Sequence, residues 1–335
     1  MRGVTGFVVL VVSVVACRET VVIDQSAIDA GGGFDGGQTF CSGAPTAFKP
    51  QSPKVMVVLD RSESMTGPFG SSSALAVTRD ALDQNATRYQ NLIWFGYSDF
   101  PGSNCSPSQT CCVGAFSAPN PTLSGFSMAL HGCDKNQSCA NPTGSQRPTA
   151  APLYTCLNVF NQPDPVRRYI LLITNGRPDC GFGPGPGSCG DGAETQNAIS
   201  RLLGEDVTTF VIAPGPVDFE TLQCLGDLAV AGGTAPQSSY FHAAQDPPDL
   251  NNEIGDTLRT IARDACTLDL KGFRIQETTH VAVTWKNMSI PRGNNGWDLT
   301  DSGYTITLHG TSCDQLIDDG PADFAVFPDC DPAHH

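Results

Sequence analysis

A short segment carrying one carboxylate and two hydroxyls offers the most specific chemistry in the sequence. Asp60, Ser62 and Ser64 stand on alternate residues directly after the apolar run Lys54–Leu59 (KVMVVL). At this spacing they direct hard oxygen ligands to a common point, which suits Mg²⁺ or Mn²⁺ held partly through water. The plainer alternative is a helix cap, because Asp and Ser commonly begin the helix that follows a strand. The segment therefore predicts either a cation site or a helix N-cap.

The elements around this segment alternate between apolar runs and stretches of helical period. Near-continuous apolar runs are typical of strands buried on both faces, and they occur at Lys54–Leu59, Leu92–Tyr97, Arg168–Ile173 and Val207–Ile212. Helical periodicity is found at Ser73–Arg88, Ala151–Phe160, Thr195–Leu203, Asp218–Ala231 and Pro248–Ala265. The alternation predicts an α/β fold, with a doubly wound, mostly parallel sheet and helices on both faces. In such a sheet, ligands bind beyond the carboxyl ends of the strands, where Asp60 is expected.

Two later segments carry polar residues that accompany the segment beginning at Asp60. They are Arg147-Pro148-Thr149-Ala150-Ala151-Pro152-Leu153 and Ile173-Thr174-Asn175-Gly176. Together with the segment that begins at Asp60, and in this order, they resemble the three loops of the metal-ion-dependent adhesion site of the von Willebrand factor type A family. The resemblance covers roughly residues 54–265. It implies a Rossmann-like type A domain with a binding or adhesion function.

Two residues depart from the family's pattern. Arg147 stands where the family usually has a threonine hydroxyl, and the neutral Asn175 stands where it has an aspartate. One interpretation is that Arg147 reaches Asp60 and replaces the cation, because a guanidinium pairs strongly with carboxylates. The competing interpretation is that Thr149 supplies the hydroxyl and Asp179 the second charge, with Arg147 in solvent. Both substitutions lower cation affinity, which favours a degenerate site with weak or no binding of Mg²⁺ or Mn²⁺.

The 14 cysteines predict disulfides and an oxidising compartment. No C-x-x-C pair occurs, which argues against zinc and thioredoxin-like chemistry. Cys180 and Cys189 bracket a Gly- and Pro-rich stretch, so we expect them to pair with each other. Without Cys17, thirteen cysteines remain, so we expect six disulfides and at least one cysteine that is free or bonded to another chain.

The N-terminus resembles that of a bacterial lipoprotein. The apolar run that follows Arg2 is too short for a comfortable transmembrane helix and ends in Val14-Val15-Ala16-Cys17, which looks like a lipobox. Ordinary secretion and a buried N-terminal strand are the alternatives. We therefore expect residues 1–17 to be a lipoprotein signal peptide with lipidation at Cys17. An aspartate directly after the lipidated cysteine is the usual signal for retention in the inner membrane. Arg18 stands at that position, which favours location in the outer membrane.

Two regions beside the α/β domain have a composition of their own. Residues 18–52 carry glycine clusters and predict a flexible tether, so that the main domain spans residues 53–265. Within it, residues 101–148 are rich in Cys, Pro, Ser and Gly and predict a disulfide-braced insertion. Residues 266–335 predict a small, disulfide-braced β module, similar to extensions beside type A domains in some bacterial surface lipoproteins. Its acidic residues predict a solvated face rather than a calcium site: Asp314, Asp318, Asp319, Asp323, Asp329 and Asp331.

Composition narrows the classes of function. The chain has 34 acidic and 19 basic residues among 335, for a net charge of −15, which argues against nucleic acid as a partner. No arrangement of nucleophile and base for catalysis is found, so we expect no enzyme. We expect a lipid-anchored, extracytoplasmic binding module of the bacterial cell envelope, with an unidentified protein or polysaccharide ligand. The alternative is a structural envelope protein with no ligand near Asp60.

Overall fold

The structure is a computed structural model, and the elements described below lie within residues 39–334. It describes residues 40–41, 46–47, 49–102, 113–132, 146–160, 164–180, 189–191, 193–234, 242–269, 281–300, 305–327 and 330–331. The predicted signal peptide with Cys17 and most of the predicted tether lie outside these residues. Among the described residues, no helix has the length and apolar character needed to cross a membrane.

A mostly parallel sheet forms the centre of the α/β domain, as predicted, and it has six strands. Its order is β10-β9-β8-β3-β6-β7, with β3 (Lys54–Asp60) in the interior. The other parallel strands are β6 (Trp94–Phe100), β8 (Arg168–Ile173), β9 (Val207–Pro214) and β10 (His242–Ala244). Strand β7 (Phe116–Asn120) pairs antiparallel with β6 at the edge. The carboxyl ends of the parallel strands therefore meet at one edge of the sheet.

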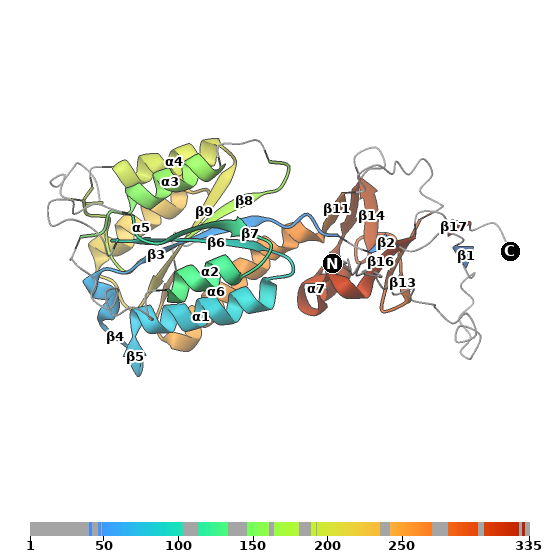
Figure 1. Cartoon of the computed structure of the whole chain (residues 1–335), viewed down its shortest axis with the longest axis horizontal. Coiled ribbons are helices and arrows are strands. Elements are labelled where there is room, and N and C mark those ends of the chain that lie inside the picture. Colours follow the sequence, from blue (N-terminus) through green and yellow to red (C-terminus); the bar gives the residue numbers. More distant parts are fainter. Residues whose placement is uncertain are drawn as a thin grey trace, which may run out of the picture. The chain divides into compact units, whose positions relative to one another are not determined.

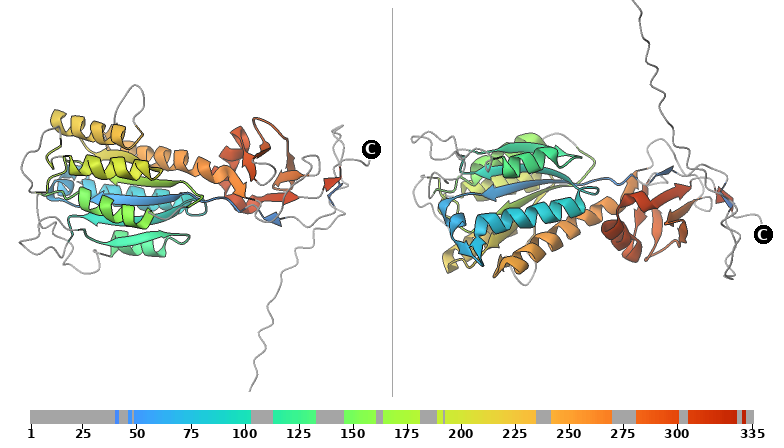
Figure 2. Two further views of the ribbon diagram at one scale, coloured as in Figure 1. Left: turned by 90° about the horizontal axis from the view of Figure 1, so that it is seen from above. Right: turned by 60° about the horizontal axis from the view of Figure 1, so that its bottom comes forward.

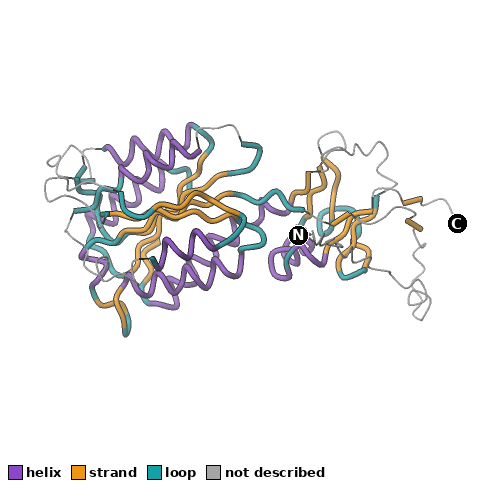
Figure 3. Tube along the Cα trace, in the orientation of Figure 1, coloured by secondary structure: helices purple, strands orange, loops and turns teal. Residues whose placement is uncertain are grey.

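Helices cover both faces of this sheet (Figure 1). Helices α1 (Ala74–Tyr89), α2 (Ser124–His131) and α6 (Pro247–Ala262) lie on one face. Helices α3 (Ala150–Phe160), α4 (Glu194–Gly204) and α5 (Phe219–Ala231) lie on the other. Figure 3 shows the strands between the two helical layers.

The alternation of side chains along β3 explains the two layers. Val55, Val57 and Leu59 pack into one core cluster, and Met56 and Val58 into the other. Successive side chains of a strand point to opposite faces, so a continuous apolar run supplies both cores at once. The apolar run thus accounts for the doubly wound sheet.

The predicted insertion at residues 101–148 contributes regular structure. Its described part includes β7, which extends the main sheet, and α2, which packs Phe126 and Leu130 into the core. The sequence analysis missed α2 because a helix of eight residues is too short to give a clear hydrophobic periodicity. The cysteines of the insertion lie outside the described residues.

The C-terminal region contains short strands that pair antiparallel, and one helix. One sheet has the order β11-β15-β14, from Thr267–Asp269, Thr305–Leu308 and Trp297–Thr300. Another has the order β13-β12-β16-β2, from Met288–Ile290, Ala282–Trp285, Phe324–Phe327 and Thr46–Ala47. Helix α7 (Gly310–Asp319) is an element that the sequence analysis did not predict. Figure 2 shows these elements in two further views.

The predicted boundary of the tether is wrong at its C-terminal end. Strand β2 pairs with β16, and β1 (Phe40–Cys41) pairs with β17 (Cys330–Asp331). Pro50 forms a bridge with Leu268 as well. Residues 40–41, 46–47 and 50 therefore pair with strands of the C-terminal region, because the unpaired N–H and C=O groups at an open sheet edge can bond an extended segment.

Helix α7 forms ion pairs with α1 and α6 of the α/β domain, and a disulfide joins it to the residue that directly follows this domain. Cys266 is bonded to Cys313. Asp318 lies 2.6 Å from Arg259 of α6 and 3.2 Å from Arg88 of α1. Asp314 pairs with Arg259 as well, at 3.2 Å. These carboxylates were predicted to be simply solvated. The structure corrects this, since partly exposed arginines face them across the contact.

Candidate functional site

The loops after β3, β8 and β9 and the segment before α3 form a surface that we call the top face; it contains Asp60, Arg147 and Asn175. Asp60 is the last residue of β3 and is fully buried. Its Oδ1 accepts a hydrogen bond from the backbone N–H of Ser62 at 2.7 Å. Its Oδ2 accepts one from the hydroxyl of Thr174 at 2.6 Å. The carboxylate is thus held by two neutral donors from two loops.

Arg147 lies beside this carboxylate. Its Nε is 3.5 Å from Oδ2 of Asp60, and the side chain is 20% exposed. A Cβ on Gly176 would collide with the guanidinium, so a larger residue at that position would push the end of the Arg147 side chain aside. The backbone of Arg147 forms two hydrogen bonds with that of Asp179, of 2.7 and 2.9 Å, which fix its position.

Burial governs the protonation of Asp60. Loss of hydration raises the pKa of this carboxyl above its ordinary value of 3.8. The hydrogen bonds from Thr174 and Ser62 and the charge of Arg147 act in the opposite direction. The cost of burying the charge is therefore only partly compensated by its neighbours.

The two serines and Asn175 bond mainly to one another. The hydroxyls of Ser62 and Ser64 are 3.0 Å apart. Ser64 donates its hydroxyl hydrogen to Oδ1 of Asn175 at 2.6 Å, and Nδ2 of Asn175 donates to the carbonyl of Ser64 at 3.1 Å. This reciprocal pair needs an amide, because an aspartate could not donate the second bond.

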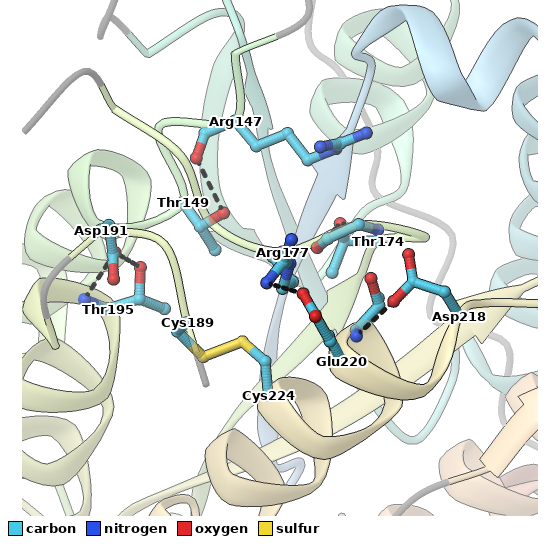
Figure 4. The surroundings of a disulfide bond; sticks show 12 residues. Arg147, Thr149, Thr174, Arg177, Cys189, Asp191, Thr195, Asp218, Glu220 and Cys224 are labelled. Atoms are coloured by element: carbon cyan, nitrogen blue, oxygen red, sulfur yellow. Dashed lines mark hydrogen bonds and ion pairs between the residues drawn. A yellow bond between two sulfur atoms is a disulfide. The ribbon is translucent and has the colours of Figure 1, made fainter. Parts of the chain in front are cut away.

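Thr149 and Asp179 take positions that differ from their predicted alternative roles. Thr149 is fully buried, and its hydroxyl donates to the carbonyl of Arg147 at 3.3 Å. Figure 4 shows the side chain of Arg147 running away from Thr149. Asp179 is exposed, and its backbone forms the two hydrogen bonds with the backbone of Arg147. The hydroxyl of Thr149 is thus bonded to the backbone of Arg147.

The donor set does not fit a resident divalent cation. It offers one carboxylate, and a guanidinium of opposite charge lies next to it. Mg²⁺ and Mn²⁺ are held by sets of oxygen ligands that usually carry net negative charge. Within the described residues, no cluster of three or more His, Cys, Asp or Glu side chains could hold a metal ion.

A buried charge cluster that the sequence analysis missed supports the loop after β3. Arg61 pairs with Asp99 at 2.9 Å, and both are buried. Asp99 also accepts hydrogen bonds from the hydroxyl of Tyr97 at 3.1 Å and the backbone N–H of Ala115 at 2.7 Å. Burial raises the pKa of Asp99, while Arg61 lowers it. Gly114 is required here, because a Cβ would overlap the carboxylate of Asp99. The signal in the sequence that could have revealed this cluster is Asp99, an acidic residue near the end of the apolar strand β6.

The predicted bond between Cys180 and Cys189 is wrong. Cys189 is bonded to Cys224 of α5, with the two Cα atoms 5.0 Å apart (Figure 4). Cys180 is disulfide-bonded as well, with a partner other than Cys189. Proximity in sequence misled the prediction, since α5 carries Cys224 to this position only in the folded chain. The bond ties the segment before α4 to α5.

No protein-family model and no curated protein matches the chain. Among solved structures it is similar to the pilus adhesin SpaC from Lactobacillus rhamnosus GG, with 12% identity and a TM-score of 0.46, covering 83% of this chain and 38% of that one. The chain thus spans well under half of SpaC.

Two other solved structures are covered over more of their length. The conserved hypothetical protein BatB from Bacteroides thetaiotaomicron has 16% identity and a TM-score of 0.43, covering 63% of this chain and 100% of that one. The manganese-loaded TRAP protein of Plasmodium vivax has 13% identity and a TM-score of 0.44, covering 67% of this chain and 78% of that one. The solved structures similar to this chain thus include von Willebrand factor type A-like folds.

Proposed function

We propose that the chain is a non-catalytic, extracytoplasmic binding module whose top face works without a divalent cation, with Arg147 in the cation's place. The observation that carries the proposal is the distance of 3.5 Å between Nε of Arg147 and Oδ2 of Asp60. A guanidinium at this position supplies the positive charge that a cation would bring. Because the guanidinium is part of the chain itself, the top face carries this positive charge without binding a metal ion.

Disulfides support the extracytoplasmic part of the proposal. Cys189–Cys224 and Cys266–Cys313 both join distant parts of the chain. Such structural disulfides persist in oxidising compartments. Anchoring through a lipid on Cys17 remains part of the proposal and rests on Val14–Cys17. Intact mass of the detergent-extracted protein tests it: a mature chain that begins at acylated Cys17 is expected, and an unmodified chain that begins elsewhere would rule it out.

Crosslinking in the native envelope tests the binding function. A photo-crosslinking amino acid at the exposed Glu63 of the top face is compared with one at the exposed Gln90, at the other end of α1. We expect a defined protein or polysaccharide adduct from position 63 and none from position 90. The adduct should persist in EDTA and disappear with Arg147→Gln.

Each other outcome has a definite meaning. An adduct that EDTA abolishes contradicts the metal-free part of the proposal. If neither position gives an adduct, the top face has no ligand and the structural role in the envelope takes precedence. An adduct at position 63 that Arg147→Gln leaves unchanged shows a ligand that does not depend on Arg147, and it contradicts the role proposed for this residue. A folded, correctly located variant is verified by its disulfide pattern and membrane fraction.

A further inference from the structure

Strands β1 and β17, close to the two ends of the described chain, form a two-stranded sheet of their own. Each strand has two residues, Phe40–Cys41 and Cys330–Asp331. A two-stranded sheet is only marginally stable in water even when a tight turn joins its strands, and here almost the whole described chain lies between them. The pairing of β2 with β16 also involves only Thr46 and Ala47 of β2. The backbone hydrogen bonds are therefore too few to hold the N-terminal strands in place by themselves.

The register of this small sheet brings two cysteines together. Cys41 lies directly opposite Cys330. Residues that lie opposite each other in antiparallel strands share one face of the sheet and have Cα atoms about 4.5 or 5.5 Å apart. A disulfide requires Cα atoms separated by about 4.4–6.8 Å. A shift of the register by one residue would place the two cysteines on opposite faces, so the register present here is the one that permits a bond.

The other cysteines of the C-terminal region already have partners. Between residues 266 and 335 the chain has three cysteines, and two of them, Cys266 and Cys313, are bonded to each other. Cys330 is the third. Since β1 and β2 pair with strands of the same region, Cys41 is the cysteine that remains for it there.

The number of cysteines agrees with such a bond. Thirteen cysteines follow Cys17, which is an odd number, and Cys156 is a buried free thiol. When Cys156 is set aside, twelve remain, enough for six disulfides. Besides the two bonds already described, these are Cys180, which carries a disulfide, the pair Cys41 and Cys330, and the five cysteines of the insertion at residues 101–148. Without Cys41 and Cys330, Cys180 and the five cysteines of the insertion form a complete set of three pairs.

We propose that Cys41 and Cys330 form a disulfide that fastens the N-terminal strands β1 and β2 to the C-terminal strands β17 and β16. The two thiols together lose two protons and two electrons, and the electrons pass by thiol–disulfide exchange to a protein disulfide donor of the oxidising compartment. The bond involves no residue of the top face, so it goes beyond the proposed binding function and does not depend on it.

The bond has a consequence for the anchored chain. The proposed lipidation site, Cys17, precedes Cys41 in the sequence. A bond between Cys41 and Cys330 would join the anchored end of the chain covalently to the C-terminal strands. The attachment would then no longer rely on strands of two residues.

Peptide mapping of the full-length protein tests the bond directly. Free thiols are alkylated, and the chain is digested without reduction by trypsin and chymotrypsin together, which cut between Cys313 and Cys330, for instance after Phe324. We expect a peptide that contains Cys41 linked to one that contains Cys330. Alkylation of either cysteine in the wild type, or a link from either to any other cysteine or to a second chain, would overturn the proposal.

Thiol counts on single variants provide a second test. After unfolding in urea without reduction, Cys41→Ser and Cys330→Ser should each show one thiol more than the wild type, because each variant releases the partner of the residue that is changed. The double variant should show the same count as the wild type. Unchanged counts in both single variants would mean that the two cysteines are not bonded to each other. Recovery of the Cys189–Cys224 link in each variant verifies that the α/β domain has folded.

Amide hydrogen exchange tests whether the bond holds the strands. In the double variant, peptides that cover β1 and β17 should exchange at least about tenfold faster than in the wild type, because the small sheet then opens readily. Cys156→Ala is the matched control: it removes a cysteine outside any disulfide and should leave this exchange unchanged. Equal exchange in the double variant and the wild type would show that the bond does not hold these strands, even if mapping finds it.

Discussion

Arg147 and Asp60 form an ion pair in which the carboxylate is fully buried and the guanidinium is 20% exposed. The carboxylate has hydrogen-bond donors from two other residues, whereas the guanidinium has no recorded acceptor among the described residues. The hydrogen-bonding needs of the carboxylate are therefore met by other residues, and those of the guanidinium are not. Asp60 needs the positive charge nearby, and Arg147 needs acceptors that Asp60 does not provide.

Replacement of Arg147 should lower stability. Arg147→Ala leaves the buried Asp60 without a compensating charge, and we expect the free energy of unfolding to fall by about 1–3 kcal/mol. Urea unfolding at pH 7 measures it. Arg177→Ala is the control, because its pair with Glu220 is largely exposed and a surface pair contributes about 0–1 kcal/mol. Equal losses in the two variants would show that Arg147 does not stabilise Asp60.

The buried Asp60 should give stability a dependence on pH. Its pKa is raised in the folded state above 3.8, so the folded chain binds the proton more tightly than the unfolded chain. The contribution of Asp60 to stability is then fully present below pH 3.8 and is lost as the pH rises through the higher, folded-state pKa. Compared with Asp60→Asn, the wild type should become relatively less stable over that interval.

Asp218 should give stability the opposite dependence on pH, and the variant Asp218→Asn tests this. The hydrogen bond from the backbone of Thr221 lowers the pKa of Asp218. Its contribution should be present above pH 3.8 and be lost as the pH falls through the lowered pKa. Unfolding curves for the three proteins at several pH values decide the matter, and a difference between wild type and Asp60→Asn that is constant with pH would contradict the assignment.

Binding of Mn²⁺ should require two changes in the top face. We expect the wild type to bind Mn²⁺ with a dissociation constant above about 1 mM. The double variant Arg147→Thr with Asn175→Asp removes the competing charge and adds a carboxylate, so it should bind more tightly than either single variant. Calorimetric titration tests this, with Asp60→Ala in the double variant as the control that abolishes binding. Sub-millimolar binding by the wild type that Asp60→Ala removes would mean that the site holds a cation as it stands.

The Cys189–Cys224 disulfide should be a large local source of stability. It closes a loop of 35 residues, for which the chain-entropy relation gives roughly 3–4 kcal/mol. Peptide mapping without reduction should recover Cys189 linked to Cys224, and the double variant Cys189→Ala with Cys224→Ala should unfold at lower urea. A peptide that links Cys180 to Cys189 would refute the pairing.

Cys156 provides an internal control for the same experiment. It is a buried free thiol, and burial raises its pKa to about 12. It should react with an alkylating reagent only after unfolding, because the thiolate is the reactive form. Rapid alkylation of Cys156 in the folded protein would contradict its burial.

The sequence by itself determined the α/β domain, because the signals for its elements are local. The apolar run Lys54–Leu59 predicts β3 to within one residue, and Arg168–Ile173 is β8 without change. The helical periodicity in Ser73–Arg88 likewise places α1 to within one residue at each end. Since ligands gather beyond strand ends, the position of Asp60 on the top face follows from the same pattern.

Only the tertiary structure decided which distant groups meet. The sequence left open whether Arg147 faces Asp60 or solvent, and it paired Cys189 with the wrong cysteine. Both outcomes depend on how helices pack across the sheet, which brings Gly176 beneath Arg147 and Cys224 beside Cys189. The addition of β2 to β16 is of the same kind, because strand pairing over most of the chain's length leaves no trace in local periodicity.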